Sequence, residues 1–443
     1  MSSEGDRSAR RAAGLWPPPK HAWIAGAGVG LIYLAHLMYG GLVGDVALSM
    51  YLVAALLAAG ALATPSVRAD LLRLKGLEAA ALLFGLVLVV GVWSLTPYVP
   101  GGPHPIWTYV GLKGAATVDR STTIVEMIKL LGLACFFIVG AATGARDDRA
   151  RWAVWLMVLL GGAFALWAFV GSATGSIVQQ SRRVEAHFLN ANTAGNVFAA
   201  LAILGVAATL SAQGRGRRWR AEVLLLAGAT ATLAATMFAT ASRGAFAAIT
   251  AALLVYLLVR LAGGGLKLSR ALGVALASIA ILAVALVFFG DQLLDRLVQG
   301  GSDPQLRLQA WRTHWEAFLA SPLFGYGLGN FEPINKSLLS VSNFDYLFNL
   351  RVPLNLYLQW LEEGGLLMAV PMFLCVAWLL LLTLRGAVRR SRMTGVLAGL
   401  LACDAVFLVH GFTDSALFTP SVAALWAWAL GLQVSLAQGT SSR

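Results

Sequence analysis

The sequence predicts an all-α membrane protein with about twelve transmembrane helices. Of its 443 residues, 58% are hydrophobic and only 12% are charged, whereas soluble proteins carry about 25% charged residues. The apolar runs are continuous and roughly 18–22 residues long, which is the length of a helix that crosses a bilayer. Strands of an outer-membrane barrel would instead alternate apolar and polar residues.

Twelve apolar runs, each bounded by polar residues, glycine or proline, account for the predicted spans. They are 22–40, 45–64, 78–96, 122–143, 152–173, 192–211, 221–240, 243–261, 270–290, 364–384, 394–414 and 419–437. The chain then divides into a tail at 1–21, nine spans within 22–290, a folded polar loop at 291–363, three spans within 364–437 and a tail at 438–443. The first tail lacks a small-residue cleavage site, so we expect no cleaved signal peptide.

The basic residues predict the orientation of these spans. The net charge of +12 could suggest nucleic-acid binding, but about two thirds of the basic residues cluster in alternate loops and in the tails. This is the positive-inside pattern. It predicts cytoplasmic tails, a periplasmic or extracellular long loop, and no nucleic-acid partner.

Several classes of chemistry lack their signatures in this chain. The three cysteines lie apart inside apolar runs, which argues against a disulfide framework or a thiolate metal site. There is no phosphate-binding loop, zinc motif or GxSxG, and no early acidic pair of the metal-dependent glycosyltransferase type. We therefore expect no metal or cofactor, and a mechanism in which arginines neutralise a phosphate leaving group.

The stretch from Gln305 to Phe331 is the most informative part of the long loop. Helical spacing puts Arg307, Trp311, His314 and Phe318 on one face, and the helix should stop at Pro322 before a tight turn rich in glycine. Such a helix could lie in the membrane interface. It could also cover an outward cavity with Arg307 directed at an anion.

Other polar residues interrupt the apolar runs. Arg243 separates two spans, and an arginine at that depth either reaches for the membrane surface or binds an anion. Glu126 and Lys129 are spaced to form an ion pair. His410 and Asp414 are spaced i, i+4, which favours a hydrogen bond over a metal site because two ligands are too few.

The residues 353–365, PLNLYLQWLEEGG, predict an amphipathic interfacial or re-entrant helix. Its polar side chains could bind sugar hydroxyls or simply orient the loop. We expect the segment before span six, residues 174–191, to be a solvated loop. Candidate substrate-binding residues in these segments are Asn355, Tyr357, Gln359, Asn192, Arg312, Arg182, His410 and Asp414.

The chain resembles the O-antigen ligase/polymerase superfamily of bacterial membrane glycan transferases. The stretches that carry the resemblance are FLNANTAG at 188–195, ATASRGAF at 239–246, the segment 307–331, NLYLQWLEEGG at 355–365 and HGFTDSALFTP at 410–420. The resemblance implies transfer of a glycan from undecaprenyl pyrophosphate at the periplasmic face of the inner membrane. The acceptor would be another lipid-linked glycan in a polymerase or lipid A-core in a ligase.

The resemblance also implies roles for particular residues. Arg243 and Arg307 match the two arginines that engage the pyrophosphate. Where the family has a histidine that serves as general base in ligases, this chain has Leu354. His314 and Glu363 are the candidate replacements.

Leu354 and the exopolysaccharide-like ending favour a polymerase of O-antigen or exopolysaccharide over a ligase. A transporter or flippase of lipid-linked glycans is the alternative from another class. Membrane lipids and other proteins of polysaccharide assembly are further expected partners.

Overall fold

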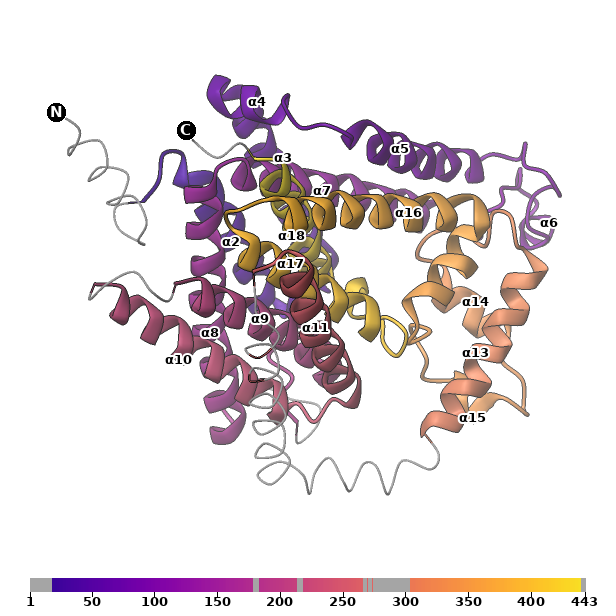
Figure 1. Ribbon diagram of the computed structural model, residues 1–443. Helices are drawn as coiled ribbons and strands as arrows, with labels where there is room; N and C mark the ends of the chain where they lie inside the picture. The colour runs from indigo at the N-terminus through magenta and orange to yellow at the C-terminus, as the bar shows by residue number, and fades with distance from the viewer. Residues whose placement is uncertain are drawn as a thin grey trace.

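The computed structural model describes residues 18–177, 183–212, 218–265, 269, 273 and 303–439. Within these residues every regular element is helical and there is no strand (Figure 1). Nine of the described helices are long and apolar enough to cross a membrane, and two shorter apolar ones accompany them. The expectation of a polytopic α-helical membrane protein is confirmed, while the count of twelve spans stays a prediction.

Eleven of the twelve predicted spans coincide with a described helix, and span 270–290 lies outside the described residues apart from position 273. The candidate spans are α3 (Gly44–Ala63), α5 (Leu77–Ser94), α7 (Arg120–Gly144), α8 (Asp147–Thr174), α9 (Ala191–Ala212), α10 (Arg218–Ala239), α11 (Arg243–Ala262), α16 (Leu356–Arg389) and α18 (Pro420–Gln438). The shorter apolar helices are α2 (Ala22–Leu37) and α17 (Thr394–His410). The remaining elements are η1 (Tyr39–Gly41), α4 (Pro65–Leu71), α6 (Ile106–Val110), α13 (Asp303–Ala320), α14 (Phe331–Ser337), α15 (Phe344–Leu347) and η2 (Ala416–Phe418).

Small residues let α7 and α18 pack with their backbones in contact. A Cβ on Gly140 would lie 2.0 Å from the carbonyl oxygen of Trp428, and one on Gly431 would lie 2.0 Å from that of Phe137. Membrane helices use such positions because lipid supplies no hydrophobic force between them and close packing must hold them together. This contact fixes α7, which carries Glu126 and Lys129, against α18.

Loops that were expected on the same side of the membrane lie together. At one end of the bundle, Arg390 is ion-paired with Asp147 at 2.8 Å, and Gln438 Nε2 donates to the carbonyl of Lys75. At the other end, the N–H of Leu356 donates to the carbonyl of Gly411 at 2.8 Å. This agrees with the predicted grouping of loops, while the membrane side of each end stays a prediction.

The helix α16 is broken at Gly365, where φ is 59° and ψ is −175°. The prediction had placed the start of a span at 364, but helical residues begin earlier, at Leu356, because the side chain of Asn355 caps the N–H groups of Tyr357 and Leu358. The amphipathic stretch and the span therefore form one element with an internal break.

The loop after α13 hydrogen-bonds to the broken part of α16. The N–H groups of Tyr326 and Gly327 donate to the carbonyls of Glu362 and Glu363, at 3.0 and 2.8 Å. In the other direction, Leu366 donates to the carbonyl of Pro322 at 2.8 Å. Buried backbone groups need partners, and the loop supplies the ones that the break removes. Figure 1 shows α13 and α14 beside the first part of α16.

The predicted glycine turn is present in this loop. Gly325, Gly327 and Gly329 all have positive φ values, of 62°, 95° and 78°. At Gly327 there is also no room, since a Cβ would lie 1.9 Å from Thr117 Oγ1. The turn thereby packs on the segment that leads into α7.

Candidate functional site

Residues from three helices meet at one end of the bundle and form the arginine cluster, which we define as Arg243, Arg307, His410, Thr413 and Asp414. Nη1 of Arg307, on α13, donates to the carbonyl of Thr413 at 2.9 Å. Arg243 begins α11, and the next residue, Gly244, packs against the ring of His410, where a Cβ would lie 3.1 Å from Nε2. The two arginines that the sequence singled out thus flank the same hairpin after α17.

Arg243 owes its position to a helix cap. The chain turns sharply between α10 and α11, and the side chain of Ser242 accepts from the N–H of Ala245 at 3.3 Å. A serine in this role satisfies one of the free N–H groups of the first turn. Arg243 is therefore the first residue of a helix, where the helix dipole adds positive potential to its own charge.

Several polar atoms in the arginine cluster are buried without a hydrogen-bond partner among the described residues. They are both ring nitrogens of His410, Oδ2 of Asp414 and Oγ of the adjacent Ser415. The predicted hydrogen bond between His410 and Asp414 is wrong, because Asp414 instead uses Oδ1 to accept from the N–H of Ser415 at 2.6 Å. Buried polar groups normally have partners, so these atoms are available to bind a ligand or water.

A third arginine lies beside this region. Arg183 donates through Nε to the carbonyl of Thr240 at 2.6 Å and through Nη2 to Asn192 Oδ1 at 2.9 Å. It is thereby tied to the turn that precedes Arg243. Sequence reasoning chose Arg182, which lies outside the described residues. The sequence signal for this arginine was the pair Arg182–Arg183 before the asparagine-rich start of α9. The pattern does not indicate which of the two arginines contacts the turn.

His314 lies away from any surface. Its exposed fraction is 0%, with Nδ1 2.9 Å from Glu362 Oε1 and Nε2 3.1 Å from Asn335 Oδ1. Asn335 in turn donates to the carbonyls of Leu347 and Leu350. The imidazole therefore links α13, α14 and α16, and both of its nitrogens are already engaged.

Glu363, which follows Glu362 on α16, supports the glycine turn. Its Oε2 accepts from the N–H of Gly329 at 2.8 Å, and its Oε1 accepts from the N–H of Phe331 and from Nε2 of Gln359. The residue as a whole is 6% exposed. Glu363 also lines the pocket described below. The same side chain therefore holds the glycine turn and contacts an accessible space.

Three further candidate residues lie on α13 and at the start of α16. Asn355 caps α16, and the O–H of Tyr357 donates to the carbonyl of Leu408 at 2.7 Å. Arg312 lies on the exposed side of α13. Asn355 and Tyr357 therefore orient α16 against the end of α17, which is the alternative role that the sequence left open for this stretch.

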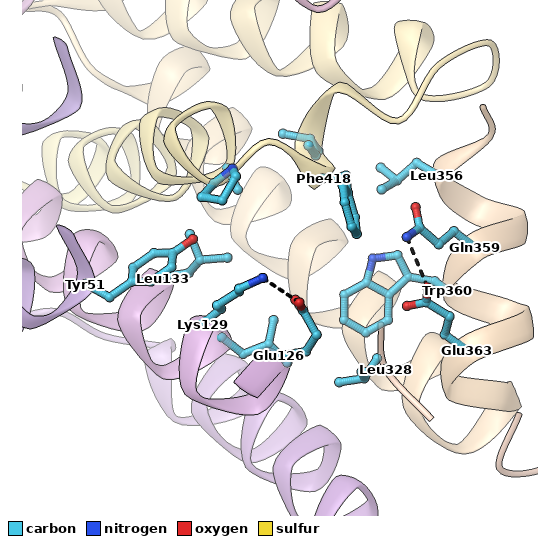
Figure 2. A pocket seen from close by; sticks show the side chains of 14 residues that line it. Tyr51, Glu126, Lys129, Leu133, Leu328, Leu356, Gln359, Trp360, Glu363 and Phe418 are labelled. Atoms are coloured by element: carbon cyan, nitrogen blue, oxygen red, sulfur yellow. Dashed lines mark hydrogen bonds and ion pairs between the residues drawn. The ribbon is translucent and has the colours of Figure 1, made fainter. Parts of the chain in front are cut away.

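A polar pocket lies on the other side of the first part of α16. It has a volume of about 120 Å³, and its polar lining residues are Tyr51, Glu126, Lys129, Gln359 and Glu363. The expected ion pair is present, with Lys129 Nζ 2.5 Å from Glu126 Oε1. Figure 2 shows this pair across the pocket from Gln359, Trp360 and Glu363.

The helix that carries the ion pair is well anchored at its start. Asp119 caps α7 by accepting from the N–H groups of Ser121 and Thr122. The hydrogen bond from the Ser121 hydroxyl, supported by those of Thr122, holds the pKa of Asp119 below its ordinary value. Asn330 joins this cap to the glycine turn, since its Nδ2 donates to Thr117 Oγ1 at 3.0 Å.

Within the described residues, no three histidine, cysteine or acidic side chains gather as a metal site requires. The groups that could act on a substrate there are guanidinium, imidazole, carboxyl and amide groups. Guanidinium groups bind phosphate oxygens in pairs and keep their charge. The arrangement suits an anionic, phosphate-bearing ligand at the arginine cluster.

A comparison with protein families agrees with this geometry. The family described as O-antigen ligase matches residues 228–370, which hold Arg243, Arg307, the glycine turn and the first part of α16. The match covers this part of the chain and shows what it is similar to. No curated protein matches the chain. The family supports a membrane glycan transferase that handles lipid-linked glycans in general, and it does not separate polymerases from ligases.

Proposed function

We propose that this protein, which resembles the O-antigen ligase family over residues 228–370, is a metal-independent, inverting glycosyltransferase that acts at the periplasmic face of the bacterial inner membrane. It would transfer a glycan from undecaprenyl pyrophosphate to an acceptor sugar during the synthesis of O-antigen or exopolysaccharide. The observation that carries the proposal is the arginine cluster, in which two arginines flank a hairpin that has several buried polar atoms without a hydrogen-bond partner among the described residues.

The arginines act on the leaving group. Arg243 and Arg307 bind the pyrophosphate, whose charge increases as the bond between the anomeric carbon and its phosphate oxygen breaks. Fixed positive groups stabilise that developing charge more than water does. The acceptor hydroxyl oxygen bonds to the anomeric carbon from the opposite face, which inverts the configuration, and its proton passes to a base on the protein.

His410 is the group that we propose as this base, ahead of His314 and Glu363. Its ring lies in the arginine cluster with both nitrogens unpartnered among the described residues, whereas those of His314 are engaged by Glu362 and Asn335. The N–H of Leu356 donates to the carbonyl of Gly411, so His410 lies next to the segment that contains Leu354. An imidazole there could replace the family histidine as the group that accepts the proton of the acceptor hydroxyl.

The experiment that tests the proposal replaces the arginines one at a time. Arg243→Ala and Arg307→Ala should each abolish high-molecular-weight glycan on cells while the protein remains in the membrane at its normal level. Arg351→Ala is the matched control, since Arg351 is an exposed basic residue of the same polar segment. Normal glycan in both cluster variants would contradict the mechanism.

Polymerase activity is favoured within this proposal by Leu354, which stands where the family's ligases have the histidine proposed as general base. Deletion of the gene should leave single repeats attached to the surface lipid, seen as loss of chain length on a gel. A lipid A-core without any glycan would indicate a ligase instead. A flippase is distinguished by proteoliposomes with donor and acceptor both supplied outside, because only a transferase forms product there.

A further inference from the structure

The segment between α5 and α7 exposes a set of large apolar side chains. We define the tyrosine loop as residues 97–113, which include α6 (Ile106–Val110), and Figure 1 shows α6 beyond the end of α5. Its exposed large side chains are Tyr98, Ile106, Tyr109, Val110 and Leu112, and Tyr109 is 91% exposed. Exposed apolar side chains that are grouped in this way mark a surface that contacts a partner or a membrane.

The tyrosine loop is folded around one aromatic ring. The guanidinium carbon of Arg120 lies 4.5 Å from the centre of the Trp107 ring. Nε1 of Trp107 donates to the carbonyl of Thr117 at 2.9 Å. Because the loop has this interior, the exposure of Tyr109, two residues further along, is a property of the folded loop.

Hydrogen bonds tie both ends of the tyrosine loop to the ends of two helices. Arg120 is the first residue of α7, and its guanidinium group donates to the carbonyls of Leu95 at 3.1 Å and Lys113 at 2.6 Å. On α5, Nε1 of Trp93 donates to the carbonyl of Tyr98 at 2.7 Å. The loop therefore keeps close to the points at which α5 ends and α7 begins.

These hydrogen bonds fix the height of the tyrosine loop relative to the spans. α5 ends at Ser94 and α7 begins at Arg120, and both helices are candidate membrane spans. The ends of membrane spans lie near the boundary between the hydrocarbon core and the headgroup layer. Tyr98 accepts one of the bonds and Leu112 precedes Lys113, which accepts another. Their exposed side chains therefore lie at the level of that boundary.

The chemistry of this surface suits lipid headgroups. Tyrosine is enriched where a membrane meets water, because its ring is apolar and its hydroxyl group is polar. Lys113 is the one lysine, arginine or acidic residue between Glu78 and Asp119, so the loop has a cation and no carboxylate. Contact with lipid is strengthened by apolar area and by the attraction of basic side chains to anionic lipids.

We propose that the tyrosine loop lies in the headgroup layer of the bilayer. Tyr98, Tyr109 and Leu112 insert among the lipids, and Lys113 lies beside their phosphates. The partner of this surface is the lipid layer itself and not a second protein. The inference goes beyond the proposed function and requires only that α5 and α7 cross the membrane.

The contact with lipid also sets the height of the glycine turn above the bilayer. The N–H of Val118 donates to the carbonyl of Tyr326 at 2.9 Å, and Nδ2 of Asn330 donates to Thr117 Oγ1 at 3.0 Å. Both bonds come directly after the tyrosine loop in the chain. A loop anchored in the headgroup layer therefore holds the turn, and the broken part of α16 bonded to it, at one level.

The test measures the depth of spin labels on the full-length protein in vesicles of phosphatidylcholine and phosphatidylglycerol. The three cysteines are first replaced by alanine, and one label is attached at Tyr109→Cys or Leu112→Cys. Collisions of the label with oxygen, which concentrates in the bilayer, are compared with collisions with a nickel chelate, which stays in water. We expect an oxygen-to-nickel ratio several-fold higher than that of the control Lys336→Cys, whose side chain is exposed on α14.

Each outcome decides the inference. A ratio equal to that of the control would place the tyrosine loop in water and overturn the inference. A label that neither reagent reaches would show that protein covers the loop, and it would overturn the lipid contact as well. Leu112→Asp should lower the ratio of the Tyr109→Cys label to that of the control, because a carboxylate is repelled by lipid phosphates. Leu112→Ile should leave the ratio unchanged.

A second measurement uses the unmodified protein, in case the cysteine variants do not fold. The vesicles then contain phospholipids with a diazirine either next to the headgroup or at the end of the acyl chain, and mass spectrometry identifies the peptides labelled by photolysis. We expect the first diazirine to label residues 97–113 and the second to label them several-fold less. Absence of label from the first would overturn the inference. Neither measurement needs catalysis, so a loop that lies in water would leave the transferase proposal intact.

Discussion

His314 on α13 and Glu362 on α16 form a buried pair, with 2.9 Å between Nδ1 and Oε1 and both side chains fully buried. The pair joins the helix that carries Arg307 to the helix that carries Gln359 and Glu363. A residue that the sequence suggested as a base is therefore part of the frame that joins α13 to α16. Its removal should affect the stability of that frame.

His314→Ala should lower the stability of the folded protein by about 3–5 kcal/mol, because it leaves buried polar groups on Glu362 and Asn335 without their partner. The measurement is thermal unfolding in detergent. His314→Leu combined with Glu362→Leu should recover much of the loss, since an apolar pair leaves no unpaired buried group. A double variant less stable than either single variant would contradict this account.

The same geometry predicts that His314→Gln, where it folds, keeps the pH profile of glycosyl transfer between pH 6 and 8. Both ring nitrogens are occupied by protein groups, so no proton of the acceptor reaches them. Transfer rates across this range, measured with purified protein, check the prediction. A shifted or flattened pH profile would contradict this and indicate that His314 acts as a base.

His410→Ala should abolish transfer and leave the protein in the membrane. Leu354→His in the same variant should restore part of the activity, because residue 354 lies close to the hairpin after His410 through the contact of Leu356 with Gly411. Loss of activity by a purely structural route would not be repaired by an imidazole at another position. His410→Ala with full activity, or a complete absence of rescue alongside a misfolded single variant, would count against His410 as the base.

Arg183→Ala should weaken binding of the donor by about 1.5–3 kcal/mol, the contribution of a hydrogen bond to a charged group. Arg183 holds both the carbonyl of Thr240 and the side chain of Asn192, and these flank the turn that positions Arg243. We expect a higher KM for the lipid-linked donor in a transfer assay. Asn192→Ala, which removes one of the two contacts, should give a smaller effect in the same direction, and an effect on the acceptor alone would contradict the assignment.

Gly365→Ala should disrupt the loop and abolish activity. The residue has a φ of 59°, and a Cβ would lie 2.3 Å from the carbonyl oxygen of Leu323. With ψ at −175° this backbone conformation is essentially restricted to glycine and costs an alanine about 1–3 kcal/mol, and the clash with backbone adds to it. Gly228→Ala is the control, because a Cβ there meets nothing within 4 Å. Limited proteolysis of the loop reports the difference directly.

Sequence patterns predicted the spans because twenty apolar residues leave few alternatives to a membrane helix. They also predicted the α13 helix, its glycine turn and the Glu126–Lys129 pair, which depend on local spacing. They gave no information on the partners of His314, since Glu362 and Asn335 are brought to it by tertiary packing. They also placed a hydrogen bond between His410 and Asp414, because i, i+4 spacing sets proximity and leaves side-chain direction open.

The break at Gly365 has a consequence for how this domain can change in evolution. The loop and α16 are joined through backbone groups, from Pro322 to Gly327 on one side and from Glu362 to Leu367 on the other. Such bonds constrain side chains only where φ is positive or space is lacking, as at Gly325, Gly327 and Gly365. Neighbouring side chains are free to diverge on an unchanged frame, so new sugar specificities could arise here without a new fold.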